Sequence, residues 1–216
     1  MQGLAAVQRG VDVVVRHSGK IWRDPRWRFI TETGMTSSGK TSIFDQLQAH
    51  DPNLRKVPSV TTRPSRPEEI RNGTHYIFVS VTEFAEMKAE RKFAWVAPSY
   101  NGFLYATRKE DLLKAACGEY PSLLDVEPSS LEKLRGMFLR PLLCSAFVSI
   151  RDEAVLEARL RKRDQGQPDA YYKQRIEESR WYNKWAEQNP HDLLLIDNSG
   201  DLEDAVQVFA NHLWKN

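Results

Sequence analysis

The sequence is poor in cysteine and has no long hydrophobic run. Its 216 residues include only Cys117 and Cys144, too few for a disulfide framework or a cysteine metal cluster. No apolar stretch approaches the roughly 20 residues that span a bilayer. The short VDVVV run near the N-terminus carries an aspartate, unlike a secretory signal. We therefore expect a protein of a reducing compartment, the cytoplasm, with no membrane partner.

A charge excess of one sign is also missing. The 31 Lys and Arg residues face 29 Asp and Glu residues, so the formal net charge is +2. A dedicated nucleic-acid binder should carry a clear basic excess, so we expect no nucleic-acid partner. With 41% hydrophobic and 28% charged residues, the chain has the composition of an ordinary globular domain with a real core.

Strands and helices alternate in the predicted order from Trp27 onward. WRFITET reads as a strand, a glycine-rich turn follows, and TSIFDQLQAH has helical spacing. Later strands (YPSLLDVE, RPLLCSAFVSI, HDLLLIDNS) alternate with helices (KEDLLKAA, SSLEKLRGM, DEAVLEARLRKRD, LEDAVQVFANHLWK). This alternation predicts an α/β fold with a parallel sheet covered on both faces. The stretch from VPSVTTRPSRPEE to FAWVAPSYNGFLYAT predicts a small β-rich insertion.

Residues 1–27 form an N-terminal extension of different character. MQGLAAVQRG could be a short helix, VDVVV a short strand, and RHSGKIWRDPRWR a basic connector with two tryptophans. The extension either packs on the core or is partly disordered, or it is an arm for a partner or for oligomerisation. We leave monomer and homodimer open.

A phosphate-binding loop is the strongest local signal. Residues 34–41, GMTSSGKT, fit G-x-x-x-x-G-K-[ST] between a predicted strand and a predicted helix. The glycines let backbone N–H groups surround phosphate oxygens, and the helix N-terminus adds a favourable dipole. Lys40 can reach the β- and γ-phosphates, and the Thr41 hydroxyl can ligate Mg²⁺. The predicted ATP-binding residues of the loop are Gly34, Thr36, Ser37, Ser38, Gly39, Lys40 and Thr41.

Two further patterns point to the same chemistry. In LLDVE, Asp125 and Glu127 share one face of a strand, which suits a carboxylate pair near a metal, with Asp125 as the metal candidate. The alternative is a pair of solvated acids at a strand end. Thr61–Arg66 places two arginines and several hydroxyls in a proline-stiffened turn. Because arginine forks bind phosphate oxygens in pairs of hydrogen bonds, this turn predicts a second phosphate pocket.

Together these segments resemble guanylate kinases. GMTSSGKT, SVTTRPSRPEE, NGTHYIFV, NGFLYATR, LLDVE, RLRKR, KQR and IDNS occur in the family's order and at about its spacing, from about Phe29 to the C-terminus. The resemblance implies a guanylate-kinase-like domain over residues 28–216 with a three-layer P-loop core (28–57, 108–158 and 186–216). It also implies an NMP-binding subdomain (58–107) and a mobile helical lid (159–185).

The resemblance also implies an activity and a role for each matching residue. The reaction would be transfer of phosphate from ATP, with Mg²⁺, to a nucleoside monophosphate. Lys40 and Thr41 would hold ATP phosphates and Mg²⁺, and Asn198 would lie beside the adenine. The acceptor phosphate would meet Arg63, Arg66, Tyr76 and Tyr105, with Glu69 bracing the arginines, and its base would meet Ser59, Thr107 and Glu127. Arg159, Arg163 and Arg175 would neutralise the transferring phosphoryl group.

The sequence departs from the family pattern at three points. One extra residue separates Glu69 from Gly73, and the family's Tyr-Gly-Thr/Ser segment is Tyr105-Ala106-Thr107. The glutamate that pairs with guanine donors aligns with Trp95, whose indole offers only a donor. GMP or dGMP is the family acceptor, but Trp95 predicts altered base specificity. It either abuts a different base or packs in the subdomain core.

Three functions follow as alternatives. The first is an ATP-dependent nucleoside-monophosphate kinase. The second is a non-catalytic module whose phosphate pocket binds phosphopeptides, and the third is a kinase of a phosphorylated non-nucleotide. The intact GMTSSGKT loop favours catalysis. The lid arginines support it too, although they could also be a solvated basic face.

Overall fold

A computed structural model describes residues 16–17, 20–24, 26–66, 69, 75–100, 102–138, 142–190 and 193–215. The short helix and strand expected within residues 1–15 lie outside the described residues. No helix in these ranges is long and apolar enough to cross a membrane.

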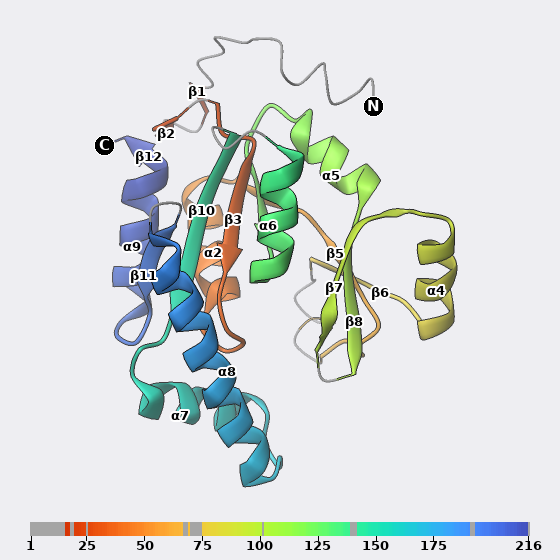
Figure 1. Cartoon of the computed structure of the whole chain (residues 1–216). Helices are drawn as coiled ribbons and strands as arrows, with labels where there is room; N and C mark the ends of the chain where they lie inside the picture. Colours follow the sequence, from red (N-terminus) through yellow and green to blue (C-terminus); the bar gives the residue numbers. More distant parts are fainter. Residues whose placement is uncertain are drawn as a thin grey trace.

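Five parallel strands form the main sheet, in the order β11-β10-β3-β9-β4 (Figure 1). They are β3 (Phe29–Thr33), β4 (Arg55–Lys56), β9 (Ser122–Asp125), β10 (Leu143–Ser149) and β11 (Leu194–Asp197). Every residue of β3 is buried, as expected for a central strand covered on both faces. The loop that follows β3 therefore leaves from the middle of the sheet's carboxyl edge.

Helices cover both faces of this sheet. On one face, α2 (Lys40–His50) and α9 (Leu202–Leu213) bury Phe44, Leu47 and Phe209 against Ile30 of β3. On the other, α5 (Lys109–Ala116) and α6 (Pro128–Met137) pack around Phe29. The predicted α/β fold is confirmed, and α5 coincides with KEDLLKAA.

A second, four-stranded sheet in the order β6-β5-β8-β7 lies beside the main sheet (Figure 1). Its strands are β5 (Ser59–Thr61), β6 (Tyr76–Phe78), β7 (Phe93–Tyr100) and β8 (Phe103–Arg108). Helix α4 (Val81–Ala89) covers it by packing Phe84 against Phe93, with ring centroids 4.7 Å apart. This sheet is the predicted β-rich insertion.

Two helices, α7 (Glu153–Arg163) and α8 (Asp169–Gln188), form a hairpin that projects from the carboxyl edge of the main sheet (Figure 1). The turn between them contains Gly166, whose φ of 79° is readily adopted only by glycine. Leu156, Leu160 and Tyr172 form the apolar contact of the hairpin. Both predicted lid boundaries, at 159 and 185, fall inside these continuous helices.

The C-terminal part of the extension packs on the core. Strand β2 (Lys20–Trp22) pairs antiparallel with β1 (Arg16–His17) and with β12 (Trp214–Lys215). Trp22 is buried against Trp214, with ring centroids 5.5 Å apart. The predicted final helix is therefore too long at its end, since α9 stops at Leu213 so that Trp214 can pair with β2.

Candidate active site

One cleft gathers most of the predicted site residues. It lies among the loop after β3, the second sheet, the carboxyl end of β9 and the helix hairpin. The predicted residues that line it are Gly34, Thr36, Ser37, Gly39, Lys40, Thr41, Ser59, Arg63, Arg66, Glu69, Tyr76, Tyr105, Asp125, Glu127, Arg159, Arg163 and Asn198. Four predicted residues do not line it: Ser38, Trp95, Thr107 and Arg175.

The loop after β3 has no room for side chains at its two glycines. A Cβ atom at Gly34 would lie 2.2 Å from the carbonyl oxygen of Val148, and Gly34 has a φ of +155°. At Gly39, with a φ of +93°, a Cβ would lie 2.2 Å from the Asn198 amide nitrogen. Lys40 begins α2 and donates from Nζ to the carbonyls of Gly34 (2.7 Å) and Met35 (3.0 Å). The loop therefore has the curled shape and the cation that a phosphate site needs.

Asn198 holds the loop from the side of β11. Its Nδ2 donates to the carbonyl oxygen of Ser38 at 2.8 Å, and the residue is 1% exposed. Its Oδ1 is buried and has no hydrogen-bond partner among the described residues. Ser38 is itself buried, so it shapes the loop through its backbone and does not face the cleft.

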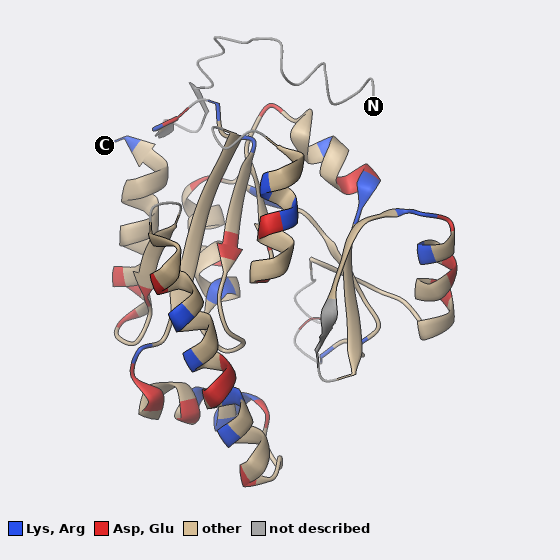
Figure 2. Cartoon of the chain, viewed as in Figure 1, with Lys and Arg blue, Asp and Glu red and all other residues tan. Residues whose placement is uncertain are grey.

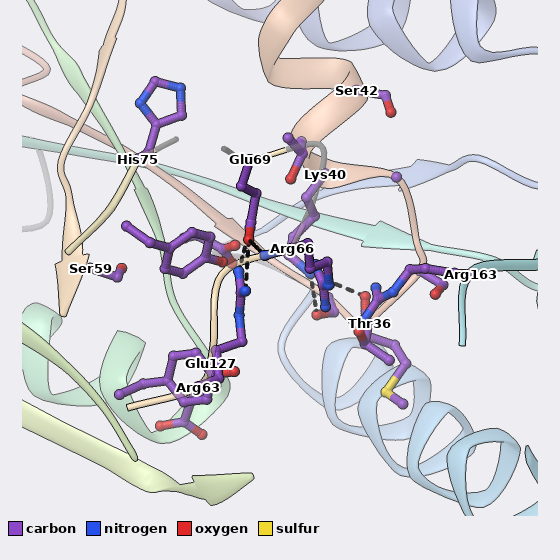
Figure 3. Close-up of a pocket in the computed structure, with 18 of the residues that line it drawn as sticks. Thr36, Lys40, Ser42, Ser59, Arg63, Arg66, Glu69, His75, Glu127 and Arg163 are labelled. Atoms are coloured by element: carbon purple, nitrogen blue, oxygen red, sulfur yellow. Dashed lines mark hydrogen bonds and ion pairs between the residues drawn. The ribbon is translucent and has the colours of Figure 1, made fainter. Parts of the chain in front are cut away.

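On the other side of the cleft, Glu69 braces the two predicted acceptor arginines (Figure 3). Its carboxylate forms a bidentate ion pair with the Arg63 guanidinium, in which Nη1 to Oε2 is 2.8 Å, and accepts the backbone N–H of Arg66 at 2.7 Å. The Arg63 guanidinium also lies 4.6 Å from the ring centroid of Tyr76 and 5.2 Å from that of Phe78. Arg63 is thus fixed by charge on one side and by aromatic rings on the other.

The contacts of Glu69 with Arg63 and Arg66 favour the charged forms of Glu69 and Arg63 at this end of the cleft. Burial would raise the pKa of Glu69, but hydrogen bonds from Arg63 and the Arg66 backbone outweigh it and lower that pKa. Burial alone would lower the pKa of Arg63, but the hydrogen bond and the charge of Glu69 outweigh it, so the pKa of Arg63 is raised. Burial, aided by the Asp125 charge, raises the pKa of Tyr76 to about 12, so its hydroxyl stays a donor.

A buried charge cluster that sequence reasoning missed lies at the cleft floor. The Lys56 ammonium is 2.7 Å from Oε1 of Glu32 and 3.8 Å from Oδ2 of Asp125. Burial raises the pKa of Glu32 to about 7, because Lys56 offsets only part of the desolvation of the carboxylate. Burial opposes the Lys56 charge too, but the two carboxylates outweigh it and raise the pKa of Lys56. The available signal was a glutamate inside the otherwise uncharged strand FITET.

Thr41 and Asp125 supply the oxygen donors that Mg²⁺ prefers. Both line the cleft, Thr41 in the first turn of α2 and Asp125 at the end of β9. The Asp125 side chain is 23% exposed, enough for a carboxylate oxygen to meet an ion from the cleft. The chemistry of this donor set therefore fits the predicted metal.

The hairpin brings two of its three predicted arginines to the cleft. Arg159 and Arg163 line it from α7, whose last turn is basic. Both charge signs occur along α7 and α8 (Figure 2). Arg175 differs from the prediction, because its side chain is 1% exposed, pairs with Glu178 at 2.6 Å and lies 4.9 Å from the Tyr171 ring centroid. Both contacts lie within α8, so the Arg175 guanidinium is buried against its own helix and does not line the cleft.

Trp95 also lies away from the cleft. It is 7% exposed and belongs to the cluster that contains Phe29, Leu112 and Leu131, so it packs in the core on the α5 and α6 face of the main sheet. A register irregularity between Phe93 and Trp95 directs these two side chains into different clusters. Of the two alternatives for Trp95, the structure shows core packing, although in the main-sheet cluster and not, as predicted, in the core of the second sheet.

The neighbours of Trp95 follow from the same register. Thr107 pairs with Trp95 across β7 and β8 and is buried with it, which removes Thr107 from the predicted base contacts. Two pairs further, Ala97 lies opposite Tyr105, and both line the cleft. Among the β7 residues whose side chains are described, Ala97 is the one that faces the cleft.

Glu127 lines the cleft, but its carboxylate caps α6. Oε1 accepts the backbone N–H of Ser130 at 2.9 Å and the Ser130 hydroxyl at 2.8 Å, and Oε2 accepts the backbone N–H of Ser129 at 3.3 Å. A carboxylate at an N-cap also interacts favourably with the helix dipole. A ligand that hydrogen-bonds Glu127 must therefore share these oxygens with the helix.

The chain is similar to proteins of one known family. The family model described as guanylate kinase matches residues 28–216. A guanylate kinase of Syntrophus aciditrophicus is 30% identical over 188 residues, which cover 87% of this chain and 86% of that protein. One from Thermosynechococcus vestitus is 32% identical over 144 residues, 66% of this chain and 73% of that protein.

A solved structure shows the same fold. The crystal structure of guanylate kinase from Anaplasma phagocytophilum superposes with a TM-score of 0.64 at 21% identity, covering 85% of this chain and 82% of that one. The family model spans nearly all of the chain after the extension, including every predicted site residue. The chain therefore belongs to the guanylate kinase family, which is a family of nucleoside-monophosphate kinases.

Proposed function

We propose that the chain transfers the γ-phosphoryl group of ATP to a nucleoside monophosphate, with GMP or dGMP as the first acceptors to consider. One observation carries the proposal. The loop cation Lys40 and the braced acceptor arginine Arg63 line one cleft, which the hairpin arginines Arg159 and Arg163 also face. Transfer of a phosphoryl group between two polyanions requires a site for each phosphate and additional positive charge close to both. The loop, the braced arginine and the hairpin arginines supply these around one cleft. The names of the relatives support the same reaction.

The reaction needs no general base, because the acceptor phosphate is already anionic at neutral pH. The loop N–H groups and Lys40 would bind the donor phosphates, and Asn198, which lines the same cleft, would lie beside the adenine. Arg63, Arg66 and the Tyr76 hydroxyl bind the acceptor phosphate. Closing the hairpin would bring in the remaining positive charges and exclude water when both substrates are bound.

Mg²⁺ is proposed as the cofactor, held by Thr41 and Asp125. When bound, it neutralises charge that develops on the donor phosphates. The two free cysteines, Cys117 exposed and Cys144 buried, suit the cytoplasm as the proposed compartment.

Base selection is proposed to be weaker than in an enzyme that reads guanine with a carboxylate. With Trp95 in the core and Ala97 facing the cleft, β7 offers no described charged acceptor to guanine's N–H donors. A site that pairs such donors rejects analogues by about 10⁴-fold or more. We expect discrimination among purine monophosphates below that level.

ADP production from MgATP against a panel of ribo- and deoxyribonucleoside monophosphates tests the proposal. Turnover with a purine monophosphate, lost in Lys40→Met, supports it. A panel without turnover, together with binding of a phosphoserine peptide, would make the chain a binding module. Turnover only with base-free phosphorylated acceptors would assign a non-nucleotide substrate.

A further inference from the structure

Three adjacent strands carry a charged side chain at or next to their last residue, near the floor of the cleft. Glu32 of β3 and Asp125 of β9 are register partners, and Lys56 of β4 lies beside them, paired to Glu32 at 2.7 Å. The Lys56 side chain is 6% exposed and that of Glu32 is fully buried. The sheet's carboxyl edge therefore carries a lysine between two carboxylates, close to the P-loop.

A buried pair of this kind is poor evidence for a stabilising role. Removing two charges from water is expensive, and apolar side chains of similar volume often stabilise a core as well or better. Glu32 also leaves Oε2 buried with no partner among the described residues, which adds to the cost. The placement of the pair therefore points to a role in the site.

Lys56 contacts the two elements that carry the proposed metal ligands. Its ammonium lies 5.4 Å from the ring centroid of Phe44 on α2, the helix whose first turn contains Thr41. The same ammonium lies 3.8 Å from Oδ2 of Asp125 on β9. Because Glu32 holds it on a central strand, Lys56 is a rigid link between that helix and that strand.

We propose that Lys56, anchored by Glu32, is a positioning residue that fixes Asp125 for the Mg²⁺ of the bound nucleotide. This inference rests on the proposed function. The Lys56 ammonium lies 3.8 Å from Oδ2 of Asp125, an ion-pair distance, and Asp125 itself lines the cleft with its side chain 23% exposed. The attraction between this ammonium and the carboxylate favours the Asp125 orientation that keeps Oδ2 near Lys56. Groups that orient a metal ligand in this way typically change metal affinity by about 10- to 100-fold.

The test measures how strongly Mg²⁺ tightens ATP binding, without any turnover. Calorimetric Kd values for ATP are determined with Mg²⁺ and with EDTA, and their ratio is the coupling. The variant is Glu32→Leu with Lys56→Met, because removing both partners leaves no unpaired buried charge and the fold survives. We expect the coupling ratio to fall about tenfold, with the metal-free Kd unchanged.

Asp125→Asn closes a double-mutant cycle. If Lys56 acts through Asp125, the triple variant loses no more coupling than Asp125→Asn alone, so the effects are non-additive. Lys56→Arg, which keeps the charge and the pair, should retain most of the coupling. As a matched control, Arg108→Met with Asp111→Leu removes another close ion pair, with Nη2 to Oδ1 of 2.9 Å, that does not line the cleft. It should leave the ratio unchanged.

The outcomes separate this inference from the proposed function. A wild-type protein that binds ATP no better with Mg²⁺ would contradict the proposed function itself. Normal coupling in the wild type and in the Glu32/Lys56 variant would overturn only the positioning role. Additive losses in the cycle would do the same, because they would place Lys56 in contact with substrate and not behind Asp125.

Discussion

Replacing Trp95 distinguishes a core residue from a base-reading one. The side chain is 7% exposed and packs among Phe29, Leu112 and Leu131. Trp95→Ala should lower the free energy of unfolding by about 3 to 5 kcal/mol, the usual cost of deleting a buried tryptophan. For a chain of this length that corresponds to a fall in Tm of about 10 °C.

The matched control is Trp181→Ala on α8. Trp181 is 56% exposed, so the same chemical change should alter the free energy of unfolding by less than about 0.5 kcal/mol. Urea unfolding followed by circular dichroism measures both variants. Neither substitution should change the ranking of nucleoside monophosphates in the kinase panel, measured as kcat/KM below the melting temperature.

Wild-type stability in Trp95→Ala, or a change in the preferred base, would refute this placement of the side chain. The first result would mean that the indole is not buried as described. The second would put Trp95 beside the acceptor base, the alternative that the sequence left open.

Three further predictions concern the loop, the brace and the extension. Lys40→Met should lower kcat by about 10²- to 10³-fold without unfolding the protein, and near-normal turnover would remove Lys40 from the reaction. Glu69→Gln should raise the acceptor KM about tenfold by freeing Arg63, with the ATP KM unchanged. The pKa of Glu69 is lowered, so the Glu69–Arg63 ion pair is fully formed above the ordinary glutamate pKa of 4.5. The pair is lost as the pH falls through the lowered pKa of Glu69. The acceptor KM, measured against pH, should therefore rise only in acid. Trp22→Ala should cost about 3 to 5 kcal/mol of unfolding free energy by emptying the contact with Trp214, and loss of activity without loss of stability would contradict this.

Local patterns in the sequence were enough to predict the core elements and the phosphate loop. The two glycines of GMTSSGKT predicted its curl, since Gly34 and Gly39 have φ values of +155° and +93°, which residues with side chains rarely adopt. Apolar runs likewise predicted the central strands, because a strand covered on both faces consists almost entirely of apolar residues. The grouping of Lys40, Arg63 and Arg159 in one cleft agrees with the family resemblance.

Tertiary structure alone decided which side chains meet across distant strands. Lys56 finds Glu32 from 24 positions away, and Trp22 pairs with Trp214 from the opposite end of the chain. Trp95 and Thr107 turn into the core because of the local register of β7 on β8, and the packed fold leaves Arg175 only 1% exposed. The identity of a single residue does not determine which strand it pairs with or in which register. Burial of apolar surface and pairing of buried charge, which settle both, act only once the strands are assembled.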